Sequence, residues 1–262
     1  MKILGIESSS LVASVAIVTD GLVTAEYTVN YKKTHSQTLL PMLDEIVRMT
    51  EQELDTVDAI AVSGGPGSFT GLRIGAATAK GLGLAMEKPL IHVPTVDAMA
   101  YQLYGCAHLI CPLMDARRSQ VYTGLYTFEE EFQVLEENAV MALGALLDRL
   151  EAYGQRRVVF LGDGVPVSRE RITERMGPRA MFAPAPCNRQ RAASVAALGA
   201  LYWEKGLSEP AAAFAPTYLR PSQAERVRAE RIQAQEQAEQ KKAGQTGGGQ
   251  ADENRRLAPE HP

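Results

Sequence analysis

A carboxylate followed by three hydroxyl side chains stands near the start of the chain, at Glu7-Ser8-Ser9-Ser10. An apolar run precedes it, so we expect these residues where a strand ends in a turn. Such a turn can offer N–H groups and hydroxyls to a phosphate, with the carboxylate placed to reach a hydrated Mg²⁺. Serine is also a common turn former without any ligand. Glu7, Ser8 and Ser9 are therefore candidates for a phosphate site, although the motif alone favours a plain turn.

A glycine-rich segment, residues 64–75, lies between an expected strand and an expected helix. Backbone amides at the start of a helix attract anions. The segment is not a Walker loop, because no Gly-Lys-Ser/Thr follows, and its spacing does not fit a dinucleotide fingerprint. Glycines also let a turn and a helix approach another backbone closely. We favour this second role, with Phe69 presented to a protein partner rather than to a nucleotide.

The histidines stand apart from other side chains that could bind a metal. His35 has no His, Asp or Glu one helical turn later at residue 39, and a zinc or iron site needs converging ligands. We interpret His35 as a hydrogen-bonding residue at the start of a helix and predict no metal site. The other histidines are His92, His108 and His261.

A second charged motif, Asp115-Ala116-Arg117-Arg118, follows an apolar run in the middle of the chain. A carboxylate and a guanidinium at a strand end can hold a ligand, or they can join two half-domains through paired hydrogen bonds. Both interpretations of Asp115 and Arg117 stay open. No nucleophile with an adjacent base and no Gly-x-Ser-x-Gly elbow occurs in the sequence. We therefore predict no catalytic residues.

The elements that would position these residues begin with a β-meander, which crossover units then extend. Their order, β-β-β-α-β-α-β-α, is that of an actin-like half-domain. The expected strands are residues 2–7, 13–18, 23–30, 57–63 and 89–93, and the expected helices are residues 36–51, 72–86 and 96–104.

A similar order restarts after residue 105. We predict an α/β protein of the actin-like ATPase (ASKHA, RNase H-like) fold with two half-domains, each with a central mixed sheet. The first spans residues 1–105, and the second, shorter and divergent, spans 106–221. The elements expected in the second are strands 109–114, 121–126, 132–137 and 158–162 and helices 143–153 and 194–205.

Composition and charge narrow the class of protein. The chain is 45% apolar and 22% charged, as globular proteins are. No basic-then-apolar leader and no stretch long enough to span a bilayer is visible, so we expect a cytoplasmic protein. The formal net charge of −4 is opposite in sign to that of a typical stand-alone nucleic-acid binder. We expect three buried free thiols, at Cys106, Cys111 and Cys187.

The segment after Arg220 has few apolar residues and cannot bury a core. We predict a charged tail over residues 222–262, with a solvated helix over 222–242 and disorder over 243–262. Because this tail lacks a core, we expect deletion of the residues after Arg220 to leave the function of the chain largely intact.

The glycine-rich segment and several shorter motifs resemble the TsaB (YeaZ) family. Residues 62–75 read Val-Ser-Gly-Gly-Pro-Gly-Ser-Phe-Thr-Gly-Leu-Arg-Ile-Gly, which is similar to the signature of that family. The order and spacing fit over residues 1–221, and the tail lies outside the resemblance. The supporting motifs are residues 3–9, 35–41, 79–82, 115–118 and 216–220.

The resemblance implies a non-catalytic paralogue of TsaD, the transferase that attaches threonylcarbamoyl to the adenosine beside the anticodon of tRNA. TsaD uses a metal held by His-x-x-x-His. Thr95 and Met99 stand where the two histidines would be, and neither side chain replaces imidazole on such a metal. We therefore expect an activating scaffold that binds no cofactor by itself, with Glu7, Ser8 and Ser9 as a vestigial phosphate site. ATP at the interface of a complex stays open.

The resemblance also implies the partners. The first half-domain is expected to dock on TsaD through its two helices and to recruit TsaE, with tRNA reached only through the complex. A homodimer of the isolated chain and the alternative that the helices face the chain's own sheet stay open. Leu43→Glu is expected to disrupt the complex if the first helix faces TsaD. The interface candidates are His35, Leu39, Leu43, Ile46, Val47, Gly67, Phe69, Leu72, Arg73 and Ile74.

Two enzymatic functions compete with the scaffold. An active small-molecule kinase or ATPase of the actin-like superfamily would use Glu7, Ser8 and Ser9 at a phosphate and the glycine-rich segment as a clamp. A metallopeptidase is the weaker alternative, because the histidine pair is missing.

Overall fold

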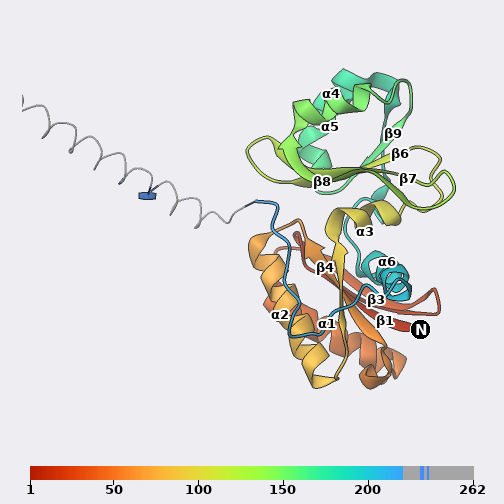
Figure 1. Cartoon of the computed structure of the whole chain (residues 1–262), viewed down its shortest axis with the longest axis vertical. Helices are drawn as coiled ribbons and strands as arrows, with labels where there is room; N and C mark the ends of the chain where they lie inside the picture. Colours follow the sequence, from red (N-terminus) through yellow and green to blue (C-terminus); the bar gives the residue numbers. More distant parts are fainter. Residues whose placement is uncertain (221–230, 233–234, 236–262) are drawn as a thin grey trace, which may run out of the picture. The chain divides into compact units, whose positions relative to one another are not determined.

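The structure, a computed structural model, describes residues 1–220, 231–232 and 235 (Figure 1). The chain divides into two compact units, Met1–Leu219 and Arg220–Pro262, and every element named below belongs to the first. The helix predicted over 222–242 lies outside the described residues except at three helical positions, and the disorder predicted over 243–262 lies wholly outside them. Those positions are Arg231, Ile232 and Gln235.

Five strands form a mixed sheet in the order β3-β2-β1-β4-β5. β1 runs antiparallel to β2 and parallel to β4. β1 and β4 are central and almost wholly buried, which explains why both read as nearly continuous apolar or small-residue runs. The strands are β1 (Lys2–Glu7), β2 (Val12–Thr19), β3 (Leu22–Asn30), β4 (Ala59–Gly65) and β5 (Leu90–Pro94).

Helices cover both faces of this sheet (Figure 1). On one face, alternate side chains of β1 and β4, such as Ile6 and Ile60, share a core with α1 and α2. On the other face, Ile3 and Ala61 share a core with α6. The amphipathic stripes of α1 and α2 are thus buried against the chain's own sheet. The helices are α1 (His35–Thr50), α2 (Phe69–Ala85), α3 (Thr95–Tyr101) and α6 (Ala192–Glu204).

A second mixed sheet follows, in the order β10-β9-β6-β7-β8. Its core is formed with α4 and α5, through residues such as Leu113, Leu147 and Ile172. The strands are β6 (Leu109–Asp115), β7 (Gln120–Thr127), β8 (Gln133–Ala142), β9 (Val158–Leu161) and β10 (Ala180–Phe182), the helices are α4 (Leu143–Glu151) and α5 (Val165–Met176), and the 3-10 turns are η1 (Leu54–Thr56), η2 (Gly177–Arg179) and η3 (Ala185–Cys187).

The two sheets have the same topology. When the second order is read from β8 to β10, β6 takes the place of β1, β7 of β2, β8 of β3, β9 of β4 and β10 of β5. Helices α4 and α5 then follow the same strands as α1 and α2. This duplication confirms the predicted actin-like α/β fold with a divergent second half. The division at residues 105 and 106 stays a prediction, and α6, which lies late in the sequence, packs on the first sheet.

One helix and one strand were not predicted, α5 and β10. α5 is dense in charge, with Arg-Glu-Arg at residues 169–171, and β10 has only three residues. The three cysteines are free thiols, of which Cys111 is buried and Cys106 and Cys187 are half-buried. Among the residues that the structure describes, no helix combines the length and apolar character needed to cross a bilayer.

Candidate functional site

A cleft of about 500 Å³ opens between the turn after β1, the start of α2 and the turn after β6. It collects residues that lie far apart in the sequence and were singled out there for different reasons. The cleft is therefore the place where the predicted phosphate site and the predicted charged pair come together. The predicted site residues that line it are Ser9, His35, Gly67, Ile74, Asp115 and Arg117.

The turn after β1 is closed on itself. The backbone N–H and the hydroxyl of Ser9 both donate to Oε1 of Glu7, each at 2.6 Å. The hydroxyl of Ser8 donates to the carbonyl of Gly71 at 2.9 Å. All three side chains are at most 1% exposed. The polar groups that would hold a phosphate are thus bonded to the protein itself.

The carboxyl group of Glu7 has an unusual protonation equilibrium. Burial raises the pKa of Glu7 to about 7, and the hydrogen bonds from Ser9 oppose this shift. Near neutral pH the group is therefore only partly ionised.

The glycine-rich segment covers the turn after β1. A Cβ on Gly67 would lie 2.4 Å from the carbonyl oxygen of Ser9, and one on Gly71 would lie 2.1 Å from that of Ser8. The N–H of Ser68 also donates to the Ser9 carbonyl at 2.6 Å. The predicted close approach of backbone to backbone is confirmed, and the surface it meets is the serine turn of the same chain.

The turn after β6 is open by contrast. The side chain of Arg117 donates to Asp115 at 3.0 Å, and its backbone N–H donates to the same carboxylate at 2.7 Å. The Arg117 side chain is 85% exposed. This pair lies within one turn, so it does not join the two halves, which corrects that interpretation of Asp115 and Arg117.

Asp97 on α3 forms a polar joint between the halves. Its carboxylate accepts from Tyr126 at 2.7 Å, from Asn138 at 3.1 Å and from Tyr202 at 3.3 Å. These donors lie on β7, β8 and α6. Burial raises the pKa of Asp97 and the three hydrogen bonds oppose the rise. Asp97 thus connects two strands of the second sheet with a helix packed on the first.

The positions of the two missing histidines lie inside the protein. Thr95 and Met99 on α3 are 0% and 1% exposed. Within the described part of the chain, no three His, Cys, Asp or Glu side chains are grouped so that they could hold a metal ion. His35 is half-buried, and its Nε2 lies 3.1 Å from the carbonyl of Val12, as expected for a hydrogen-bonding residue at a helix start.

The first helix pair does not present its predicted contact residues outward. Leu39, Leu43, Ile46 and Leu72 are at most 4% exposed, and the first three belong to the core under the first sheet. Val47 and Ile74 are half-buried against the same core. The four buried positions are corrected from contact residues to buried residues, because they leave little surface for a partner. Val47 and Ile74 are partly exposed, and Ile74 also lines the cleft, so partner contact through them stays a prediction. Leu43→Glu would therefore disturb folding before it tested docking.

Three of the interface candidates remain at the surface near the start of α2. The guanidinium of Arg73 lies 3.9 Å from the ring centre of Phe69, whose ring lies 4.8 Å from that of Tyr218. Gly67 lies beside them on the cleft. Residues 216–219, which the sequence placed in the resemblance, thus pack onto the glycine-rich segment, and Thr217 donates to the Gly64 carbonyl at 2.7 Å.

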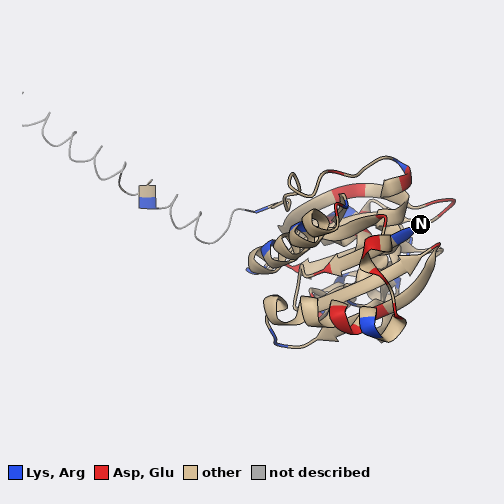
Figure 2. Cartoon of the chain, turned by 90° about the horizontal axis from the view of Figure 1, so that it is seen from below, with Lys and Arg blue, Asp and Glu red and all other residues tan. Residues whose placement is uncertain are grey.

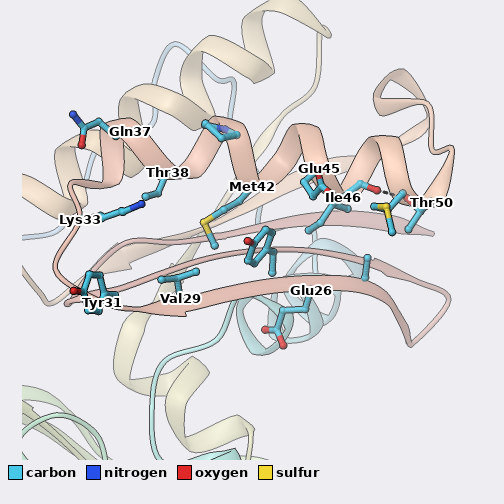
Figure 3. A pocket seen from close by; sticks show the side chains of 14 residues that line it. Glu26, Val29, Tyr31, Lys33, Gln37, Thr38, Met42, Glu45, Ile46 and Thr50 are labelled. Atoms are coloured by element: carbon cyan, nitrogen blue, oxygen red, sulfur yellow. Dashed lines mark hydrogen bonds between the residues drawn. The ribbon is translucent and has the colours of Figure 1, made fainter.

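A separate groove of about 830 Å³ runs between α1 and the edge strand β3 (Figure 3). Val29, Met42 and Ile46 lie along it, and Tyr31 lies at one end. Ile46 is the only predicted site residue in its lining. The two carboxylates of the groove, on Glu26 and Glu45, already pair with arginines. The groove therefore offers apolar contact rather than chemistry.

Asp163 is a cleft residue that the sequence interpretation missed. It lies in the turn after β9, between Gly162 and Gly164, and burial raises its pKa. Its Oδ1 accepts no hydrogen bond from the described residues. The sequence did contain a signal for Asp163, because the apolar run of β9 is followed by Gly-Asp-Gly at residues 162–164. β9 takes the place of β4 in the other half, so its end corresponds to the end of β4. Asp97 had no such signal.

Comparison with known proteins identifies the family. The model for tRNA N6-adenosine threonylcarbamoyltransferase (TsaD) matches residues 23–227. The chain is 32% identical over 229 residues to the tRNA threonylcarbamoyladenosine biosynthesis protein TsaB of Bacillus subtilis (strain 168), which covers 86% of this chain and 96% of that protein. It is 37% identical to the protein of the same name from Escherichia coli (strain K12) over 133 residues, 50% of this chain and 57% of that protein.

Solved structures agree with the sequence comparison. An uncharacterized protein from Pseudomonas aeruginosa, described as similar to peptidase YEAZ, superposes with a TM-score of 0.72 at 27% identity, covering 84% of this chain and 99% of that one. YeaZ from the same organism superposes with a TM-score of 0.68 at 26% identity, covering 83% and 99%. With a near full-length relative, a matching family model and this shared fold, the chain belongs to the TsaB (YeaZ) family.

Proposed function

We propose that this chain takes part in the biosynthesis of threonylcarbamoyladenosine in tRNA as a non-catalytic subunit that binds and activates a TsaD-type transferase. The names of its relatives place the family in that pathway. The observation that carries the non-catalytic role is the self-bonded serine turn. Ser8 and Ser9 use their hydroxyls within the protein, and Gly67 and Gly71 cover them. A kinase or ATPase would need those groups free for phosphate.

The docking surface we propose is the outward face of α1 and α2, which pack side by side. Leu40 on α1 and Leu84 on α2 are 52% and 61% exposed. Gly81 on α2 is exposed as well, with nothing within 4 Å of the position of a Cβ. A glycine inside an exposed helix costs about 1 kcal/mol relative to alanine. A glycine here would be explained if a helix of the partner packs closely against α2, because glycine has no side chain to keep the two helices apart.

Leu84→Glu tests this surface. The charge would be buried against the partner, so we expect the affinity for a purified TsaD-family protein to fall at least tenfold in a calorimetric titration. The melting temperature should stay close to that of the wild type, because the side chain is exposed.

Leu207→Glu is the matched control, since Leu207 is 56% exposed and lies after α6, away from this face. It should bind the partner as the wild type does. Equal affinity of the wild type and both variants for the TsaD-family protein would contradict the proposed docking surface. An equal loss of affinity in both variants would show a general effect of the added charge.

The other members of the proposed complex follow from the same role. TsaE would join through the pair of actin-like proteins, and the isolated chain would be free to form a homodimer through the surface that docks the transferase. ATP would enter only at the interface of the complex, beside the cleft of about 500 Å³. A fluorescent ATP analogue should then bind the assembled complex and not the isolated chain.

A further inference from the structure

A second hollow, of about 320 Å³, adjoins the cleft and shares Asp115 and Arg117 with it. It lies in the second half of the fold, between the turn after β6, the start of α4 and the first turns of α5. Three guanidinium side chains and two hydroxyl side chains line it, and we call it the arginine pocket. These residues are Arg117, Arg118, Ser119, Ser168 and Arg171.

The arginine pocket is positively charged in a chain whose net charge is −4. Its lining has three arginines and one carboxylate, that of Asp115, which is bonded to Arg117 at 3.0 Å. Arg118 and Arg171 form no ion pair with any residue that the structure describes. Figure 2, in which the chain is seen from below the view of Figure 1, shows acidic and basic residues interspersed along its elements. The pocket is thus a local concentration of unpaired positive charge.

The turn after β6, which lines the pocket, also has backbone donors without a partner in the described part of the chain. Arg117, Arg118 and Ser119 are all left-handed, with φ of 63°, 55° and 57°. Each such residue costs about 1 kcal/mol or more when it is not glycine. The carbonyl of Ser119 accepts from the N–H of Leu143 at 3.3 Å, which ties the turn to α4. Among the described residues, the N–H groups of Arg118 and Ser119 donate to no acceptor.

The chemistry of the arginine pocket matches a phosphate diester. Guanidinium groups bind phosphate oxygens with paired, charge-assisted hydrogen bonds, and hydroxyls and free N–H groups complete such sites. The rest of the lining, including Val121, Leu143 and Val167, contains no aromatic ring on which a base could stack. A free nucleotide would thus gain only its phosphate contacts here. A polymer can add phosphate contacts outside the pocket.

We propose that the arginine pocket binds a backbone phosphate of RNA, so that this chain touches tRNA directly and not only through its partner. The inference rests on the proposed function for its choice of RNA. With few contacts and an overall negative chain, binding by the isolated protein is weak and depends strongly on salt.

The test is the binding of a tRNA transcript to the isolated full-length chain, measured by fluorescence anisotropy. The salt concentration is varied from about 25 to about 200 mM, because affinity that depends on phosphate contacts falls steeply over this range. Arg118→Gln combined with Arg171→Gln should lower the slope of log affinity against log salt by about 0.9, because both arginines act on the one phosphate in the pocket and each neutralised phosphate contributes about 0.9. At about 0.1 M salt the affinity should fall at least tenfold. Arg117 is left in place because it lines the cleft.

A matched double variant, Arg157→Gln with Lys205→Gln, removes the same charge from two exposed residues outside the pocket. It should keep the wild-type slope. Equal slopes in the wild type and the pocket variant, or an equal loss in the control, would overturn the proposal. Inorganic phosphate and ATP, titrated separately, would overturn the choice of RNA if ATP bound through the pocket arginines and RNA did not.

This experiment needs no partner, so its result is independent of whether the chain binds a TsaD-type transferase. If Leu84→Glu does not weaken docking but RNA binding still depends on the pocket arginines, the proposed complex is contradicted and the RNA-binding pocket is supported. The opposite pattern would keep the complex and remove the pocket.

Discussion

The two halves of the molecule build the same turn in opposite ways. After β1, Ser8 and Ser9 are buried, and glycines of the next crossover pack against their carbonyl groups. After β6, the equivalent turn carries Arg117 and Arg118 into solvent in left-handed conformations. The strand order around both turns is the same. Side-chain size and charge, rather than topology, thus decide whether a turn of this fold closes or stays open to a ligand.

The two pairs of helices, α1 with α2 and α4 with α5, also differ in the charge of their outer surfaces. The outer side of α5 is tied to α4 by ion pairs from Arg175 to Asp148 and Glu151, which mark a solvated surface. The outer side of α2 instead carries small and apolar residues such as Gly81 and Leu84. Helices that follow equivalent strands therefore have different exteriors, and the less charged pair is the one that we propose to dock.

The closed turn can be forced open at Gly71. Gly71→Ala would place a Cβ 2.1 Å from the Ser8 carbonyl, and the contact is with backbone that cannot rotate away. We expect the free energy of unfolding to fall by more than about 4 kcal/mol, or the protein not to fold. Urea unfolding followed by circular dichroism measures the change.

Gly81→Ala is the control for Gly71, because it meets nothing within 4 Å. It should stabilise the chain by up to about 1 kcal/mol. Similar effects of the two substitutions would mean that the close approach at the serine turn does not govern stability.

The joint between the halves is tested at Asp97. Asp97→Ala leaves Tyr126, Asn138 and Tyr202 without their shared acceptor, so we expect a loss of about 3 kcal/mol in unfolding free energy. Asp115→Ala removes the exposed pair with Arg117 and should cost less than about 1 kcal/mol. A larger loss at Asp115 than at Asp97 would restore Asp115 as the residue that joins the halves.

The protonation of Glu7 gives a smaller, pH-dependent effect. Its pKa is about 7 in the folded chain and 4.5 as the ordinary value, so between these pH values the folded state keeps a proton that the unfolded state has released. Stability should therefore fall as pH rises from about 4.5 to 7. Glu7→Gln removes this loss and can still accept from Ser9.

We expect Glu7→Gln to gain stability over the wild type between pH 5 and pH 8, by at most about 3 kcal/mol. Thermal unfolding at a series of pH values measures the gain, with Glu130→Gln, an exposed position, as control. A constant difference between Glu7→Gln and the wild type across this range would show that Glu7 is ionised throughout.

The sequence predicted the fold in nearly all its elements, because strands such as β1 and helices such as α1 have strong periodic patterns. It also predicted that residues near Ser9 and Asp115 matter, and the structure brings both to one cleft. It could not assign the faces of α1, since an apolar residue such as Leu43 looks the same whether it is buried by the chain's own sheet or by a partner.

The joint at Asp97 was beyond sequence reasoning for a different reason. Its partners Tyr126 and Tyr202 lie 29 and 105 residues away, and no local pattern links positions at such separations. The arginine pocket is similar, since Arg118 and Arg171 belong to a turn and a helix that meet only in the fold.

We propose that this chain supports a reaction that it does not catalyse. Reconstitution of tRNA threonylcarbamoylation with purified TsaD, TsaE and the TsaC-type adenylate-forming enzyme, with and without this chain, tests it directly when ATP hydrolysis by the isolated chain is followed alongside. We expect modification that depends on this chain and no hydrolysis by the chain alone. Modification without the chain, together with ATP turnover that Glu7→Ala abolishes, would contradict it and favour an active ATPase.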